Sequence, residues 1–142
     1  MIKEIEQTLK QALPKDYFVT FDETHMFNLK ADLLQRNGKF AYIEEYRTGR
    51  YDAQKYGATQ KTTKIEIVFG QLTELHNEAK DRETIREEVE REAILPFIKA
   101  WNDVIKAKGQ AAAAYTFTAS FGRFDANEVS VTLTFDNKEV LC

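Results

Sequence analysis

The chain has 142 residues, of which 43% are hydrophobic and 30% are charged, and its net charge is −3. This length suits a single domain over residues 1–142, which would bury roughly two-thirds of the surface that the unfolded chain exposes. No apolar run approaches the ~20 residues of a membrane span, and the charged N-terminus lacks the apolar core of a secretory signal. We therefore expect a cytoplasmic protein that does not enter a membrane, and the acidic balance argues against nucleic acid as its main partner.

Short elements are predicted in the first third of the chain. Apolar residues spaced three and four apart over 2–13 predict a short amphipathic helix. Alternating apolar and polar residues then predict strands at 17–21 and 27–34. Asn37-Gly38 is a strong tight-turn dipeptide, because both residues tolerate positive φ, and it predicts a hairpin that joins 27–34 to a third strand over 39–46.

The segment 46–64 is predicted to be a long loop, because it has little apolar periodicity and loops of this length are often functional. From Arg47 to Lys64 it carries five cations and one acid, interleaved with tyrosines. Such a surface can bind single-stranded nucleic acid through phosphate contacts and stacking, or dock on a protein. We favour protein docking over nucleic acid, with a merely solvated loop as the alternative. The interface candidates in this loop are Arg47, Arg50, Tyr51, Lys55 and Tyr56.

The most informative segment is 81–108, which follows a predicted strand at 65–69. Its apolar residues recur at helical spacing and predict one broad buried face that includes Trp101 and Ile105. Pro96 lacks an amide hydrogen, and its ring crowds the preceding helical turn. One long helix, bent at Pro96, is therefore predicted.

Acidic residues accumulate before and along the first half of this helix. Between Glu78 and Glu92 there are seven acids and four bases. The positive loop and the acidic helix are complementary, so each molecule could present its loop to the helix of the next copy in a head-to-tail contact that closes into a ring. The candidate interface residues on the helix are Glu87 and Glu90.

Two amphipathic strands, at 115–121 and 129–135, are predicted to end the chain, joined by a turn over 122–127 beside which Arg123 is a further interface candidate. The order of elements shows no internal repeat. It predicts an α+β fold: an antiparallel or mixed sheet of about five to six strands, with the short N-terminal helix and the long proline-kinked helix packed on one face.

The sequence carries no strong catalytic or ligand signature. Phosphate-binding glycine loops, nucleophile elbows and clustered metal ligands are missing, so no catalytic residue, cofactor or metal site is predicted and an enzyme is not expected. His76 precedes Asn77 and Glu78, which is more typical of a helix entry than of an acid–base pair. A deep pocket containing His76 or Glu44 would favour an enzyme instead.

Four stretches carry a resemblance to a known group of proteins: Phe69–Asn77, Ile85–Arg86, Glu92–Phe97 and Arg123–Ser130. From about Tyr42 to the C-terminus, the chain resembles uncharacterised proteins encoded in bacterial prophages. The element order also looks like the small α+β proteins that complete phage tails or connect heads to tails, which assemble as rings. The resemblance implies a structural role in the virion, with copies of the chain and other virion proteins as partners. The alternative is a small binding module that uses 46–64 to grip nucleic acid or a host protein.

Overall fold

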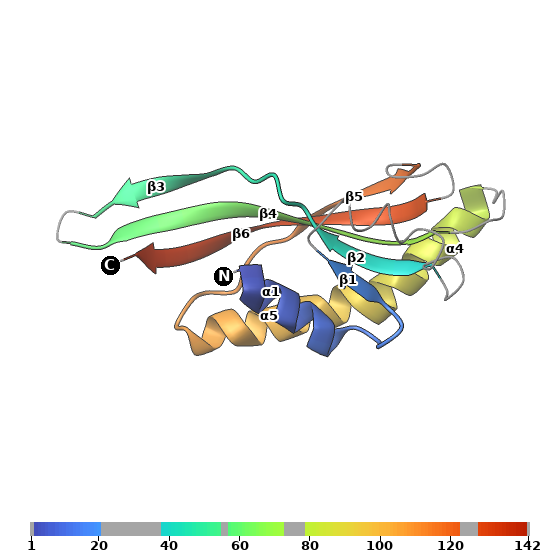
Figure 1. The fold of residues 1–142 in the computed structure, drawn as a ribbon, viewed down its shortest axis with the longest axis horizontal. Coiled ribbons are helices and arrows are strands. Elements are labelled where there is room, and N and C mark those ends of the chain that lie inside the picture. Colours follow the sequence, from blue (N-terminus) through green and yellow to red (C-terminus); the bar gives the residue numbers. More distant parts are fainter. Residues whose placement is uncertain (1, 21–37, 55–56, 73–78, 123–127, 142) are drawn as a thin grey trace.

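The structure, a computed structural model, describes residues 2–20, 38–54, 57–72, 79–122 and 128–141. In chain order its elements are α1 (Ile2–Ala12), β1 (Phe18–Thr20), β2 (Lys39–Ile43), β3 (Gly49–Ala53), β4 (Thr59–Leu72), α4 (Ala79–Val89), the π-helical turn η1 (Glu90–Ile94), α5 (Leu95–Ala107), β5 (Thr116–Phe121) and β6 (Glu128–Leu141). A six-stranded sheet forms one layer, and the helices lie together on one of its faces (Figure 1). The predicted α+β fold is therefore confirmed.

Two long strands, β4 and β6, form the centre of the sheet. Each has fourteen residues, and they pair antiparallel along their whole length. The strand order is β1-β2-β4-β6-β5, with β3 as a further partner of β4, and β1 pairs parallel with β2. Because β2 pairs with 67–71 of β4 and β3 pairs with 59–63, β2 and β3 follow one another along the same edge of β4.

The long helix is continuous from α4 through η1 to α5, and its irregular turn, η1, lies just before Pro96. In η1 the amide of Leu95 donates to the carbonyl of Glu90, five residues earlier, and Pro96 follows directly. In a regular α-helix the ring of a proline crowds the carbonyl four residues before it. For Pro96 that carbonyl belongs to Glu92, inside the wider π-turn, so the irregular turn coincides with the crowded position.

The buried face of the helix gives a second reason for the π-turn. Buried residues recur every four residues, at Val89, Ala93, Phe97, Trp101 and Ile105. Because an α-helix has 3.6 residues per turn, a strict spacing of four drifts by about 40° at each step. The wider turn takes up part of this drift, so both halves of the helix face the sheet.

The main core lies between the helices and one face of the sheet. Trp101 and Ile105 are buried, as predicted, and the Trp101 ring lies 6.4 Å from the parallel ring of Phe97. A smaller cluster lies on the opposite face, because strand residues alternate between faces. Its buried members are Phe40, Tyr42, Val68 and Leu72.

The hairpin prediction is wrong for β2. One edge of this strand pairs with β1 over residues 40–42, and the other edge pairs with β4 over 39–43. The strand predicted at 27–34 lies outside the described residues. Gly38 does adopt a positive φ of 74°, as the sequence indicated. A side chain at this position would also collide with the carbonyl oxygen of Leu72, so the position requires glycine.

The prediction of a long loop over 46–64 is also wrong. Here the structure has β3 and the beginning of β4, paired from Gly49 opposite Thr63 to Ala53 opposite Thr59. These strands lack apolar alternation because most of their side chains lie outside the core. Gly49 allows the close pairing, since a Cβ there would collide with the backbone of Thr62.

Candidate interaction surfaces

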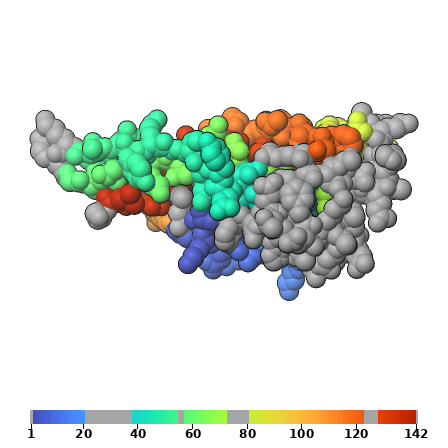
Figure 2. All heavy atoms as spheres, turned by 45° about the horizontal axis from the view of Figure 1, so that its top comes forward, coloured from blue at the N-terminus to red at the C-terminus, as the bar shows by residue number. Residues whose placement is uncertain are grey.

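One end of the sheet forms a narrow projection, which we call the arm. It consists of β3 with the paired residues 59–64 of β4 and 136–141 of β6. Figures 1 and 2 show the arm at one end of an elongated molecule, whereas α4 and β5 lie toward the other end. The arm is continuous with the central strands, so its position follows from the sheet itself.

Cationic and aromatic side chains cover the arm. Tyr51 is 68% exposed, and the ammonium of Lys61, its cross-strand neighbour, lies 5.8 Å from the centre of its ring. On the other face, Arg50 binds Asp52 at 2.9 Å, but both side chains are well exposed, so this ion pair contributes little stability. Tyr46, just before β3, is 82% exposed. The arm therefore presents aromatic groups and a small excess of positive charge, because its four cations stand beside three acids, Asp52, Asp136 and Glu139.

A groove of about 200 Å³ lies between the long helix and β5; we call it the acidic groove. Its apolar lining includes Leu95, Ile98, Phe117 and Ala119, and its acidic lining consists of Glu83, Glu87 and Glu90. Small-molecule pockets typically measure roughly 300–1,000 Å³. The acidic groove is smaller, and therefore suits an anchoring side chain better than a metabolite.

The apolar side of the groove is exposed because β5 is the last strand of the sheet. The alternation predicted for this strand is present: Phe117 and Phe121 share the face that pairs with core residues of β6. Yet Phe117 is 73% exposed and Phe121 is 49% exposed. The guanidinium of Arg82 lies 4.4 Å from the centre of the Phe121 ring and covers part of it. Phe117 thus forms an open apolar wall.

The charge of the groove is negative and only partly compensated. Arg86 is the cation of its lining, and this side chain binds Glu83 at 3.2 Å and donates to the carbonyl of Ser120 at 3.1 Å. Within the described part of the chain, no ion pair includes Glu87 or Glu90. Both are exposed, so two carboxylates are open to a cationic partner.

The structure places the sequence-selected interface residues in two separate groups. Arg47 precedes β3, while Arg50 and Tyr51 belong to it. Glu87 and Glu90 line the acidic groove. The remaining candidates lie outside the described residues: Lys55, Tyr56 and Arg123.

Sequence reasoning missed the apolar half of the groove. Leu95 is 53% exposed although it lies inside the apolar run of the helix, and Phe117 is exposed although its alternation matches that of buried residues in β6. Periodicity identifies the apolar face of an element but not how much of that face another element covers. The helical spacing does place Leu95 off the buried face, but no local signal distinguishes Phe117 from core residues.

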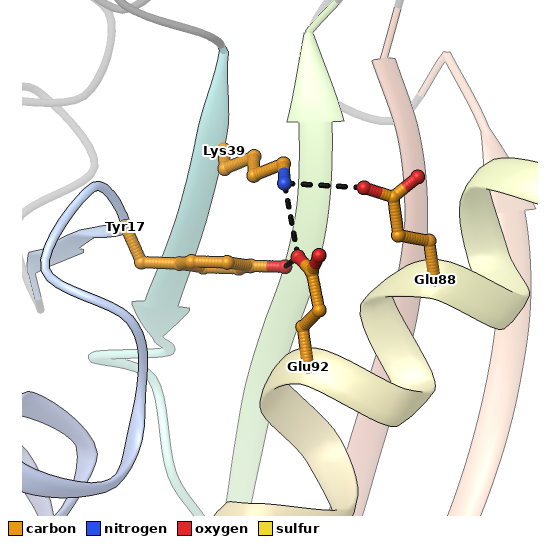
Figure 3. A network of polar contacts seen from close by, with 4 residues as sticks. All are labelled: Tyr17, Lys39, Glu88 and Glu92. Carbon is orange, nitrogen blue, oxygen red and sulfur yellow. Dashed lines mark hydrogen bonds and ion pairs between the residues drawn. The ribbon is translucent and has the colours of Figure 1, made fainter.

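A third polar group ties the sheet to the helix (Figure 3). The ammonium of Lys39 lies 2.9 Å from the carboxylate of Glu92 and 3.2 Å from that of Glu88. The hydroxyl of Tyr17 donates to Glu92 at 3.3 Å, and its ring centre lies 5.7 Å from the ammonium. These contacts join the start of β2 and the segment before β1 to the middle of the long helix.

The pKa values within this group indicate a fixed ion pair. Burial alone would lower the pKa of Lys39, but its hydrogen bonds to Glu92 and Glu88 outweigh burial and raise it. The hydrogen bond from Lys39 is the largest influence on Glu92 and lowers its pKa. Burial and then the Glu92 charge raise the pKa of Tyr17. All three side chains therefore keep their ordinary charge states near neutral pH, which suits a structural tie better than proton transfer.

No group of three or more histidine, cysteine, aspartate or glutamate side chains in the described ranges is placed to hold a metal ion. None of the helices in the described part of the chain is both long and apolar enough to cross a bilayer. His76, the histidine weighed as an acid–base candidate, lies outside the described residues.

No protein-family model matches the chain, and no curated protein matches it significantly. The arm and the acidic groove are therefore the features from which a function can be inferred. The arm combines exposed aromatic side chains with a small excess of cations, and the groove combines exposed apolar side chains with two open carboxylates.

Proposed function

We propose that the chain is a non-enzymatic assembly protein, a neck or tail-completion component of a phage particle, and that it acts through protein–protein contacts. The observation that carries this proposal is that the aromatic, weakly cationic arm lies at one end of the molecule, whereas α4 and β5, which line the acidic groove, lie toward the other (Figure 1). Complementary charged surfaces speed association and select partners. A contact between two different surfaces repeats from copy to copy, and it closes into a ring when the rotation allows.

The phage assignment is supported by the resemblance described from the sequence. It adds other virion proteins to the partners, and it predicts that the protein resides in the cytoplasm during assembly and then in the particle. The exposed Phe117 and Tyr51 agree with such a role, because large exposed aromatic side chains are enriched in protein interfaces.

The test is the molar mass in solution, measured by light scattering at high protein concentration. At about 0.05 M salt we expect oligomers, and at about 1 M salt, where the Debye length is only about 3 Å, we expect weaker association. A monomer in both conditions would contradict self-assembly.

A second candidate function is binding of single-stranded nucleic acid or a host protein by the arm. It is favoured by the exposed Arg50 and Tyr51 and by Lys61 beside them. Fluorescence anisotropy with labelled single strands, at the same two salt concentrations, separates the two functions. Salt-sensitive binding supports the nucleic-acid module, and no binding supports assembly.

A further inference from the structure

We infer that the acidic groove of one copy receives the arm of a second copy, with Tyr51 as the anchor that contacts the exposed apolar lining of the groove. This inference rests on the proposed assembly function and names the two surfaces that meet.

The arm must come from another molecule. It is built from the ends of β4 and β6, which continue directly into the core of the sheet. The arm lies at one end of the molecule, whereas α4 and β5 lie toward the other end (Figures 1 and 2), and residues of both elements line the groove. A projection that is part of the central strands cannot fold back along the sheet, so only a second copy can place its arm in the groove.

The size and lining of the groove suit a tyrosine. Phe117 and Leu95 present exposed apolar surface, at 73% and 53%, beside a volume of about 200 Å³. Tyrosine combines a large apolar ring with a hydroxyl, and it is among the commonest anchors of protein interfaces. Tyr51 is exposed and lies in a strand, so its position is set by pairing with β4.

The cations beside Tyr51 are opposite in sign to the carboxylates beside the groove. Lys61 lies against the Tyr51 ring on the same face of the arm, and Arg47 lies two residues before β3. Glu87 and Glu90 are exposed carboxylates along the helical side of the groove. Glu139 pairs opposite Lys61 on the same face, so Lys61 and Arg47 leave a net charge of +1 around the anchor. This positive charge would attract the carboxylates of the groove, whereas an acidic segment would be repelled.

Both surfaces also include a strand with an unpaired edge. Among the described residues, β3 pairs only with β4, and β5 pairs only with β6. Unpaired edges are templates for pairing with another chain. An arm that lies along β5 would bring these two edges together.

Reciprocal charge reversal tests the inference. The arm variant carries Arg47→Glu and Lys61→Glu, and the groove variant carries Glu87→Lys and Glu90→Lys. Each variant alone repels itself, so its self-association should weaken by at least about tenfold. An equimolar mixture should recover oligomers, because each reversed surface then meets its complement. A control with Lys3→Glu and Lys106→Glu, at exposed helical positions, should associate like the wild type.

Tyr51→Ala should also weaken association by at least about tenfold, whereas Tyr46→Ala, a matched loss of an exposed tyrosine, should have a smaller effect. Circular dichroism checks that every variant is folded. If the wild type forms oligomers and the charge-reversed variants associate equally well alone, the copies meet through other surfaces, and this inference fails while the assembly function survives. If the wild type is a monomer in all conditions, this inference and the self-assembly on which it rests both fail, while contacts with other virion proteins are not contradicted.

Discussion

Lys39 illustrates what a single residue contributes to this fold. Its side chain is 14% exposed and bridges two carboxylates that lie 49 and 53 positions further along the chain. A charge that is largely buried stabilises a protein only when it is paired, and an unpaired partner is costly. Nothing near Lys39 in the sequence indicates these partners, because they come from a helix that packs on the other side of the core layer.

Replacing Lys39 with methionine should therefore lower the free energy of unfolding by about 1–3 kcal/mol at neutral pH. The lowered pKa of Glu92 adds stability above the ordinary pKa of a glutamate, and this stability is lost as the pH falls through the lowered value. The raised pKa of Lys39 adds stability that is lost only as the pH rises through that raised value. The difference from wild type should thus be largest between about pH 5 and pH 9.

Urea denaturation at about pH 3 and pH 7 measures this difference. Lys61→Met, at an arm position outside the core, is the control and should change stability by less than about 0.5 kcal/mol. A Lys39→Met penalty that is equally large at both pH values would show that the lysine stabilises the fold by packing and not by charge.

At the scale of elements, the helices were predictable and β3 was not. The long helix has a periodic apolar face, and burial of Trp101 and Ile105 follows directly from that period. The arm strands have polar residues on both faces, so no alternation marks them. Threonines and tyrosines, which favour strands, were the remaining signal in 46–64, and strand propensity is weak without a buried face.

The π-turn behaves as a one-residue insertion that keeps the buried stripe in phase. Deleting the exposed Arg91, in a Pro96→Ala background that removes the crowded ring, should give a regular α-helix with the same buried face. We expect the free energy of unfolding of this deletion variant to stay within about 2 kcal/mol of that of Pro96→Ala alone. Deleting the exposed Lys99 in that background should instead rotate one half of the helix by about 100° and cost more than about 4 kcal/mol.

Urea denaturation followed by circular dichroism compares the two deletions with Pro96→Ala alone. Equal losses for the two deletions would mean that the π-turn does not set the phase of the stripe.

At the scale of the whole molecule, the two halves of the sheet differ in what covers them. Residues 65–69 of β4 have the helices on one face and the smaller cluster around Phe40 and Tyr42 on the other, whereas 59–63 lie in the arm. This division explains why the arm can project from the molecule. Residues 59–63 of β4 pair with β3 on one edge and β6 on the other, yet most side chains of the arm are not buried and can contact a partner.

Hydrogen exchange should resolve this division within one strand. In dilute monomeric protein, amides of 59–63 should exchange at least about tenfold faster than those of 65–69, because strands with little buried surface open more readily. At concentrations where oligomers form, protection of 59–63 should increase. Uniform protection along β4 would contradict the distinction between arm and core.

The sequence by itself determined the α+β class, the long helix with an irregularity close to Pro96, and the opposite charges of 46–64 and 78–92, because periodicity and composition are local properties. Only the tertiary structure decided that 46–64 contains paired strands, that Phe117 is open to solvent, and that the arm lies at the opposite end of the molecule (Figure 1) from α4 and β5, which line the acidic groove. These depend on which strands become neighbours and where the helix layer stops. A two-residue period specifies a face of a strand, but not whether a helix or water lies against it.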